Sequence, residues 1–197
     1  MPEGTTSPIR SIAVFCASSH RCPPALFDAA RTMGEAIGQR GLQLVYGGTN
    51  VGLMKELADA AHAAGARVVG VIPRFMQEKG IAGLSCHELL LAEDMRQRKS
   101  RMEELADAFV VLPGGIGTLE EFFEILTLKQ LGLHNKPIVL LNTAGYWQPM
   151  LAMLRAMIDM GVAKESLTDL YAIAESAEEV FALLEGYHAP TIPSKWA

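Results

Sequence analysis

The sequence predicts one α/β domain built on a doubly wound parallel sheet with helices on both faces. Three observations support this fold class. Half of the 197 residues are apolar, which is enough for a sizeable core in a single domain. Short apolar runs alternate along the chain with longer segments of helical periodicity. Glycine-containing turns separate many of these segments, as in parallel sheets whose strands are joined by helices.

Six apolar runs have the length of strands. The run Ala-Phe-Val-Val-Leu at residues 108–112 predicts a buried strand, and the run at residues 86–91 predicts a strand near a sheet edge. The predicted strands, in chain order, cover residues 11–16, 42–46, 67–72, 86–91, 108–112 and 137–141.

Helical patterns follow most of these strands. Pro24 stands in the first turn of the first predicted helix, and Gly41 and Gly65 end the first two helices, which are favoured positions for these residues. The stretch at residues 75–83 is expected to be irregular. The predicted helices cover residues 24–40, 53–64, 95–106, 118–131, 147–160 and 177–184. This order predicts one Rossmann-like domain over residues 1–197, with peripheral tails at residues 1–10 and 187–197.

Composition excludes several classes of protein. The formal net charge of −5 argues against a surface that coats nucleic acid. No apolar run reaches membrane-spanning length, and the polar N-terminus lacks the apolar core of a signal peptide. Cys16, Cys22 and Cys86 have neither metal-ligand spacing nor a pairing pattern. We therefore expect a soluble cytoplasmic protein with no nucleic-acid or membrane partner.

Three loops are candidates for ligand binding, because ligands in open parallel sheets lie beyond the carboxyl ends of the strands. They carry Ser18, the pair Gly47 and Gly48, and the turn at residues 113–118. The glycines of this turn allow close backbone approach, and Thr118 stands at the start of the predicted helix, where free N–H groups bind phosphate. A plain strand-to-helix turn is the alternative, since glycine-rich patterns also occur without a ligand.

Charged residues next to this turn leave alternatives open. Glu120 and Glu121 occupy the first helical turn, where acidic residues are favoured by the helix dipole alone. A carboxylate there could also stabilise an oxocarbenium-like sugar, and periodicity does not choose between the two. The basic run at residues 96–99 is either a solvated helix face or an anion site. The scattered histidines have no helical metal-site spacing, so no metal is predicted.

Residues 113–121 read Pro-Gly-Gly-Ile-Gly-Thr-Leu-Glu-Glu and match the pattern P-G-G-x-G-T-x-x-E in full. Further matches include V-Y-G-G at residues 45–48, G-V-I-P at 70–73 and R-K at 98–99. On these motifs the sequence resembles the LOG ("lonely guy") family of cytokinin riboside 5'-monophosphate phosphoribohydrolases, whose relatives were often labelled lysine decarboxylases. The resemblance covers residues 11–161 and then fades.

The resemblance implies a hydrolase that cleaves the N-glycosidic bond of adenosine 5'-monophosphate (AMP) or its N6-modified forms, releasing free base and ribose 5-phosphate. It implies catalytic roles for Arg98 and Glu121, no metal or organic cofactor, and a homodimer with its pocket near the subunit interface. Together with the loops, it gives the residues expected to bind substrate: Ser18, Gly47, Gly48, Met95, Lys99, Gly114, Gly115, Ile116, Gly117, Thr118, Glu120 and Thr127.

Two other functions compete with this one. The first is a non-catalytic nucleotide-binding or carrier protein on the same fold, which would not need Arg98 and Glu121. The second is a pyridoxal-phosphate decarboxylase, which needs a lysine Schiff base that no lysine context here supports. The sequence also departs from the family pattern near the predicted loops, which affects the expected base preference. These departures are at Ala17, Thr49, Lys55, Gly80 and Arg96.

Overall fold

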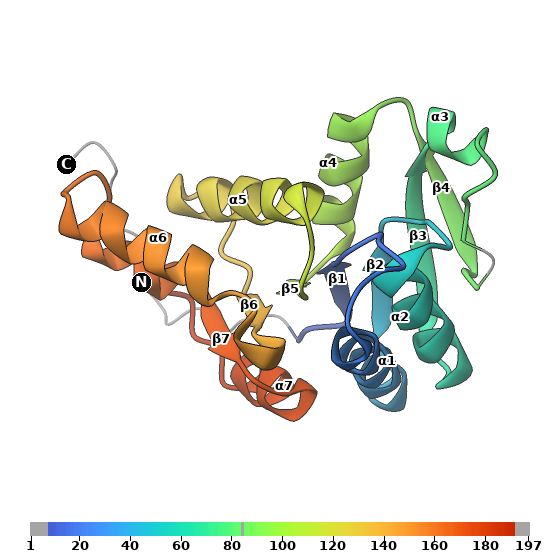
Figure 1. Cartoon of the computed structure of the whole chain (residues 1–197), viewed down its shortest axis with the longest axis horizontal. Helices are drawn as coiled ribbons and strands as arrows, with labels where there is room; N and C mark the ends of the chain where they lie inside the picture. Colours follow the sequence, from blue (N-terminus) through green and yellow to red (C-terminus); the bar gives the residue numbers. More distant parts are fainter. Residues whose placement is uncertain (1–7, 84, 192–197) are drawn as a thin grey trace.

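The computed structural model describes residues 8–83 and 85–191. It forms one seven-stranded sheet with helices packed on both faces (Figure 1). The strands are β1 (Ser11–Phe15), β2 (Gln43–Tyr46), β3 (Arg67–Pro73), β4 (Glu88–Ala92), β5 (Ala108–Val111), β6 (Ile138–Leu141) and β7 (Ala172–Ala174). The helices are α1 (Pro24–Gln39), α2 (Gly52–Ala63), α3 (Arg74–Gln77), α4 (Met95–Leu105), α5 (Ile116–Gln130), α6 (Gln148–Asp159) and α7 (Ala177–Glu185), with 3₁₀ segments at Thr143–Gly145 and Glu165–Leu170.

Every pair of neighbouring strands is parallel, and the order is β4-β3-β2-β1-β5-β6-β7. The chain builds the sheet outward from β1 to β4 and then crosses back to place β5 beside β1. The direction of winding therefore reverses between β1 and β5, where Ile12 pairs with Ala108. Open parallel sheets bind ligands in the crevice at such a reversal. The predicted doubly wound fold is confirmed, and β4 lies at an edge as expected.

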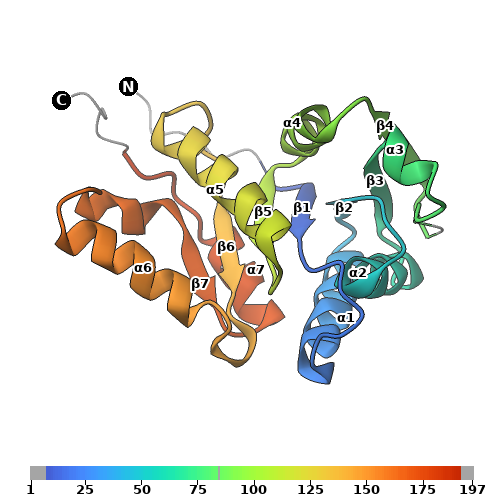
Figure 2. The same ribbon diagram turned by 45° about the horizontal axis from the view of Figure 1, so that its top comes forward.

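Alternation along the strands divides the core into two layers. In β1, Ile12 and Val14 pack toward α1, α2 and α7, whereas Ala13 and Phe15 pack toward α4, α5 and α6. Successive side chains of a strand point to opposite faces, so a central strand must be apolar at every position. Figure 2 shows α4 and α5 near β1 and β5, and both helices pack on the same face of the sheet.

The elements that sequence patterns did not predict are short. Helix α3 stands in the stretch expected to be irregular, and β7 is a three-residue strand at the sheet edge. Neither is long enough to show a periodicity. Helix α5 begins at Ile116, two residues before the predicted start, with Gly115 as its N-cap.

The predicted tails lie partly outside the described residues, at 1–7 and 192–197. Within the described part, the Tyr187 hydroxyl donates a hydrogen bond of 2.8 Å to the carbonyl oxygen of Asn135. Across the residues that the structure describes, no helix is both long and apolar enough to cross a membrane.

Candidate functional site

A cavity of about 450 Å³ lies at the carboxyl ends of β1, β2 and β5. This volume falls within the range of about 300–1,000 Å³ that is usual for small-molecule sites. Of the residues predicted from the sequence, those that line it are Ser18, Gly47, Met95, Arg98, Gly115, Ile116, Gly117, Thr118 and Glu121. The three predicted loops therefore meet at one site, as the topology of the sheet requires.

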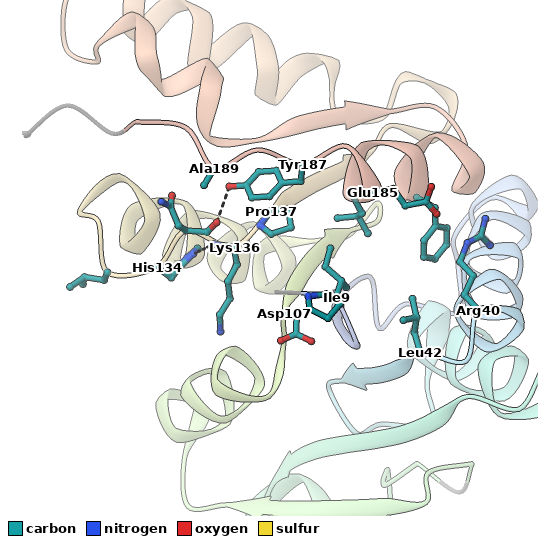
Figure 3. A pocket seen from close by; sticks show the side chains of 15 residues that line it. Ile9, Arg40, Leu42, Asp107, His134, Lys136, Pro137, Glu185, Tyr187 and Ala189 are labelled. Carbon is teal, nitrogen blue, oxygen red and sulfur yellow. Dashed lines mark hydrogen bonds between the residues drawn. The ribbon is translucent and has the colours of Figure 1, made fainter. Parts of the chain in front are cut away.

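A larger cavity, of about 1030 Å³, lies at the other end of the strands, by their amino ends (Figure 3). Its lining includes Leu42, Asp107 and Pro137, which immediately precede or adjoin the amino ends of β2, β5 and β6. It contains neither the glycine-rich turn nor the Arg98 and Glu121 side chains. We therefore assign the candidate active site to the smaller cavity, on position and chemistry rather than on size.

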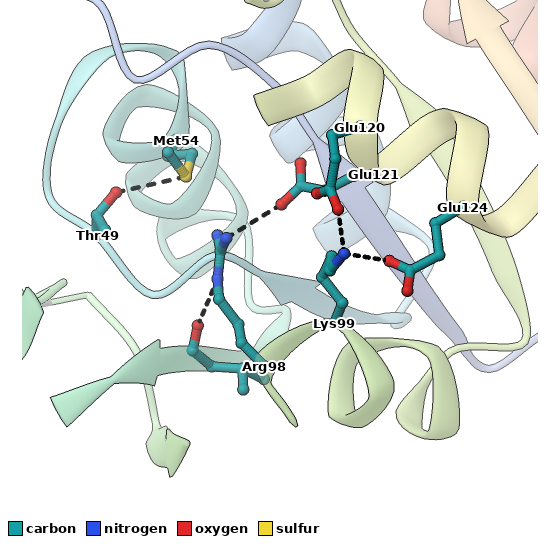
Figure 4. Close-up of polar contacts among 8 residues, drawn as sticks. Thr49, Met54, Arg98, Lys99, Glu120, Glu121 and Glu124 are labelled. Carbon is teal, nitrogen blue, oxygen red and sulfur yellow. Dashed lines mark hydrogen bonds and ion pairs between the residues drawn. The ribbon is translucent and has the colours of Figure 1, made fainter. Parts of the chain in front are cut away.

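Arg98 and Glu121 both line the smaller cavity and form an ion pair with each other (Figure 4). Arg98 Nη1 donates to Glu121 Oε1 over 3.1 Å, and the side chains are only 6% and 9% exposed. Arg98 Nε donates to the carbonyl oxygen of Val71 over 3.2 Å, which fixes the guanidinium plane. The pair joins α4 to α5, so packing of the two helices on the sheet brings together two residues that are distant in sequence.

Gly47 makes room for the Arg98 side chain. A Cβ atom at this position would stand 1.9 Å from Arg98 Nη2 and 2.8 Å from the sulfur of Met54. Any side chain here would displace the guanidinium from its position beside Glu121. The glycine after β2 is thus required by the geometry of the ion pair.

Burial is the main influence on the Glu121 carboxyl group. It raises the pKa of Glu121 from its ordinary value of 4.5 to about 7, against the opposing effect of the Arg98 charge. A carboxyl group with this pKa can release and accept a proton near neutral pH. Cys16, which also lines the cavity, is buried, and desolvation followed by the Glu121 charge raises the pKa of its thiol. The thiol is therefore uncharged beside the ion pair.

The glycine-rich turn has two functional parts. Gly114 faces the protein: a Cβ there would stand 2.1 Å from Thr118 Oγ1, so this glycine lets the buried threonine fold back under the turn. Gly115 and Gly117 have no atoms within 4 Å of an added Cβ among the neighbours described, so they border open space in the cavity. Within the described chain no side chain caps α5, so its first backbone N–H groups are available to an anion.

Several predicted binding residues lie outside the cavity lining. The Lys99 ammonium contacts the carboxylates of Glu120 and Glu124, and Glu120 is largely exposed. Thr127 is exposed on α5, six residues beyond Glu121. Gly48 and Gly114 support the loops from behind, with positive φ at Gly48.

The structure adds residues that sequence reasoning missed. The cavity wall is mostly apolar and includes four methionines, of which only Met95 was predicted. The others stand on α2, α3 and α4, and their scattered spacing gave no signal in the sequence. His20 also lines the cavity and its Nδ1 faces the backbone N–H of Gly52 at 3.4 Å. The three methionines that were not predicted are Met54, Met76 and Met102, and two further apolar residues of the wall are Val51 and Ile81.

The departures from the family pattern are not equivalent. Ala17 and Thr49 line the cavity, and Thr49 Oγ1 lies 3.4 Å from the sulfur of Met54 (Figure 4). Lys55 instead pairs with Asp59 outside it, and Gly80 adopts a positive φ of 72° in a surface turn. Arg96 is exposed. Only the first two can act directly on a ligand in this cavity.

The donor set does not suit a metal or a Schiff base. No group of three or more metal-ligating His, Cys, Asp or Glu side chains occurs among the described residues. Over residues 8–83 and 85–191, no lysine lines the cavity. A pyridoxal-phosphate decarboxylase would need one there.

Comparison with known proteins matches this chain to a family. The family model described as "Possible lysine decarboxylase" matches residues 54–184. The cytokinin riboside 5'-monophosphate phosphoribohydrolase LOG7 of Arabidopsis thaliana is 40% identical over 185 residues, which is 94% of this chain and 85% of the relative. A probable enzyme of the same name, LOGL2 of Oryza sativa subsp. japonica, is 40% identical over 92% of this chain and 74% of its own length.

The chain belongs to the LOG family.

The likeness to solved structures is one of fold alone. A molybdenum cofactor binding protein from Rippkaea orientalis superposes with a TM-score of 0.69 at 20% identity, covering 89% of this chain and 94% of that one. A molybdenum cofactor carrier protein from Chlamydomonas reinhardtii gives 0.66 at 21% identity, covering 89% and 95%. The predicted family membership is therefore confirmed, and the fold is shared with proteins of other names.

Proposed function

We propose that this LOG-family protein hydrolyses the N-glycosidic bond of adenosine 5'-monophosphates, including N6-modified ones, to a free base and ribose 5-phosphate. One observation carries the proposal: a buried Arg98–Glu121 pair shares a cavity with the uncapped N-terminus of α5. The first feature offers acid–base chemistry and the second offers an anion site. The names of the relatives, which state the same reaction class, support it.

The 5'-phosphate is assigned to the start of α5. The backbone N–H groups of Gly117 and Thr118 and the positive end of the helix dipole favour a dianion there. A side chain at Gly115 or Gly117 would occupy the space that borders the cavity. Binding at this point would place the ribose next to Glu121, one helical turn further along α5.

Glu121 is assigned to the sugar and the attacking water. As the bond between C1' and the base nitrogen breaks, its electron pair leaves with the base and positive charge develops on the ribose. The Glu121 carboxylate stabilises that charge and takes a proton from the water that attacks C1'. The departing base takes up this proton on the nitrogen that was bonded to C1', which gives the neutral free base and restores the carboxylate. A pKa of about 7 suits this exchange at neutral pH. Arg98 holds the carboxylate in place and offers its remaining N–H donors to the nucleotide.

The base is assigned to the apolar wall of the cavity. Met54, Met76 and Met102 present flexible, polarisable side chains that adapt to ligands of different shape. Such a wall suits adenine and also an apolar substituent on its N6 atom. This supports a role in releasing active cytokinin bases from their nucleotides.

Two further proposals concern the assembly and its compartment. The outer side of α5 and the loop after it expose Ile116, Leu131 and Leu133, with Ile116 82% exposed at the mouth of the cavity. Covering these side chains with a second copy would form a homodimer with the pocket near the interface. All three cysteines are free, which supports a reducing cytoplasm.

The test is direct. Purified protein is incubated with AMP and with N6-isopentenyl AMP, and free base is separated by chromatography. We expect release of base from at least one of them, and loss of release in a Glu121→Gln variant that keeps its fold. No release from either nucleotide at high enzyme concentration contradicts the proposal. Thermal stabilisation by the nucleotides without any turnover would favour a carrier function instead.

A further inference from the structure

Lys99 forms a second bridge between α4 and α5, next to the Arg98–Glu121 pair (Figure 4). Its Nζ lies 2.6 Å from Glu124 Oε2 and also contacts the carboxylate of Glu120. The Lys99 side chain is only 11% exposed, whereas its partners are more accessible. One helix thus carries two adjacent cations, and the other carries the carboxylates that receive them.

The Lys99 bridge sets the position of Glu121 in the Arg98–Glu121 pair. Helices α4 and α5 each pack mainly on other elements, and the two ion-pair bridges link them directly. Glu120 and Glu124 lie on either side of Glu121 along α5, four residues or one turn apart. Holding both carboxylates with one ammonium therefore fixes the rotation and position of the turn that carries Glu121.

We infer that Lys99 is a positioning residue, which clamps α5 through Glu120 and Glu124 and thereby holds the Glu121 carboxylate against Arg98. Lys99 then contributes to turnover without touching the nucleotide, in agreement with its place outside the cavity lining. This inference rests on the proposed function, since turnover is one of its two readouts.

The charges around Glu121 allow the inference to be tested by the direction in which the pKa of Glu121 moves. From α4, the Arg98 and Lys99 cations lower the pKa of Glu121; from α5, Glu120 and Glu124 raise it; and burial outweighs them all. Cys16, beyond β1, faces the same group as an uncharged thiol. Removing the charge of Lys99 should therefore raise the pKa of Glu121, and removing that of Glu124 should lower it.

The first experiment measures the pH dependence of kcat/KM and, at neutral pH, kcat and KM for AMP. In Lys99→Met we expect kcat to fall about tenfold, part of the contribution of about 10²–10⁴ made by a well-placed acid–base group. KM should change little, and the acidic limb of the pH profile should move to higher pH. Lys99→Arg should recover most of kcat. Arg101→Met removes a cation from an exposed pair on the same helix and should match the wild type.

Glu124→Gln separates positioning from other roles. It breaks the same bridge, so kcat should fall, but the acidic limb should move to lower pH, opposite to Lys99→Met. If Lys99 bound the phosphate, its loss would raise KM and leave the acidic limb in place, and that result overturns the inference. Shifts of both variants in one direction would also overturn it, because they would report a general loosening.

A measurement without substrate distinguishes this inference from the proposed function. The pKa of Glu121 is obtained from the pH dependence of the free energy of unfolding, by subtracting the values for the Glu121→Gln variant from those for the wild type. The same comparison is then made in the Lys99→Met background. A raised pKa in that background shows that the Lys99 charge acts on Glu121, as the clamp requires, even if no nucleotide is hydrolysed. An unchanged pKa in an active enzyme refutes the clamp and leaves the proposed function standing.

Discussion

Replacing Glu121 by Gln should change how the stability of the protein depends on pH. The carboxyl group has an ordinary pKa of 4.5 and, through burial, a pKa of about 7 in the folded chain. Between these values the folded protein binds more protons than the unfolded one. Stability from the protonated group is therefore fully present below the lower value and is lost as the pH rises through the higher one.

The size of this effect follows from the two values. Linkage gives a loss of about 2.5 kcal/mol in the free energy of unfolding between pH 5 and pH 8 for this one group. No discount for solvent screening is needed, since the Glu121 side chain is only 9% exposed. For a chain of this length the loss corresponds to a fall of roughly 5–10 °C in Tm. The Gln side chain does not titrate, so the variant should lack this component.

Urea unfolding, followed by circular dichroism, measures this loss of stability with pH. The unfolding curves are recorded at several pH values, at one ionic strength and one protein concentration. The quantity of interest is the wild-type free energy minus that of Glu121→Gln, which cancels the titration of all other groups. Glu104→Gln serves as the matched control, because it makes the same substitution at a side chain that is 57% exposed. Parallel curves for wild type and Glu121→Gln would refute a raised pKa. A difference that grows with pH would show that the charged pair with Arg98 stabilises the fold.

Three further outcomes are expected. Gly47→Ala should lower kcat/KM for AMP by about 100-fold or more, as steady-state kinetics would measure. The added Cβ would overlap the Arg98 guanidinium, and displacing a group near the reacting atoms has an effect of this order. Thr49→Gly enlarges the cavity and should move the kcat/KM ratio toward nucleotides with bulky N6 substituents over AMP, whereas an unchanged ratio would separate Thr49 from base recognition. Iodoacetamide at pH 8 should alkylate Cys22 long before Cys16, whose pKa is raised by burial, as peptide mass spectrometry would detect; equal rates would contradict this.

The sheet was predictable because its signals are strong and local. A buried parallel strand must be apolar at every position, as residues 108–112 are, and the turns around it are marked by glycine. The first six strands were predicted to within two residues, as were all described α-helices except α3. The short edge strand β7 and helix α3 were missed, because three or four residues define no period and their pairing is set by the rest of the sheet.

The site was predictable only in part. Topology alone brought the three loops together, because the carboxyl ends of parallel strands meet at one edge. Sequence spacing could not choose between Glu120 and Glu121, since both suit the first turn of a helix. The choice depends on which side of α5 faces the sheet. The methionine wall was missed for a similar reason, because its members come from three helices and meet only in the folded chain.

The two ion-pair bridges show why neighbouring residues of like charge end in different roles. Arg98 and Lys99 are adjacent, as are Glu120 and Glu121, so the sequence offers the same chemistry twice. A step of one residue turns a helix by about 100°, which sends one member of each pair into the cavity and the other to its outer side. Burial then separates them: the inner pair loses solvent, and the pKa of Glu121 rises to about 7. The outer bridge keeps contact with water through Glu120 and Glu124, and an ion pair with exposed partners adds little stability but can hold a geometry. Burying the inner pair destabilises the fold at neutral pH, and its proposed function as a proton acceptor beside the proposed phosphate site explains why the pair would be kept.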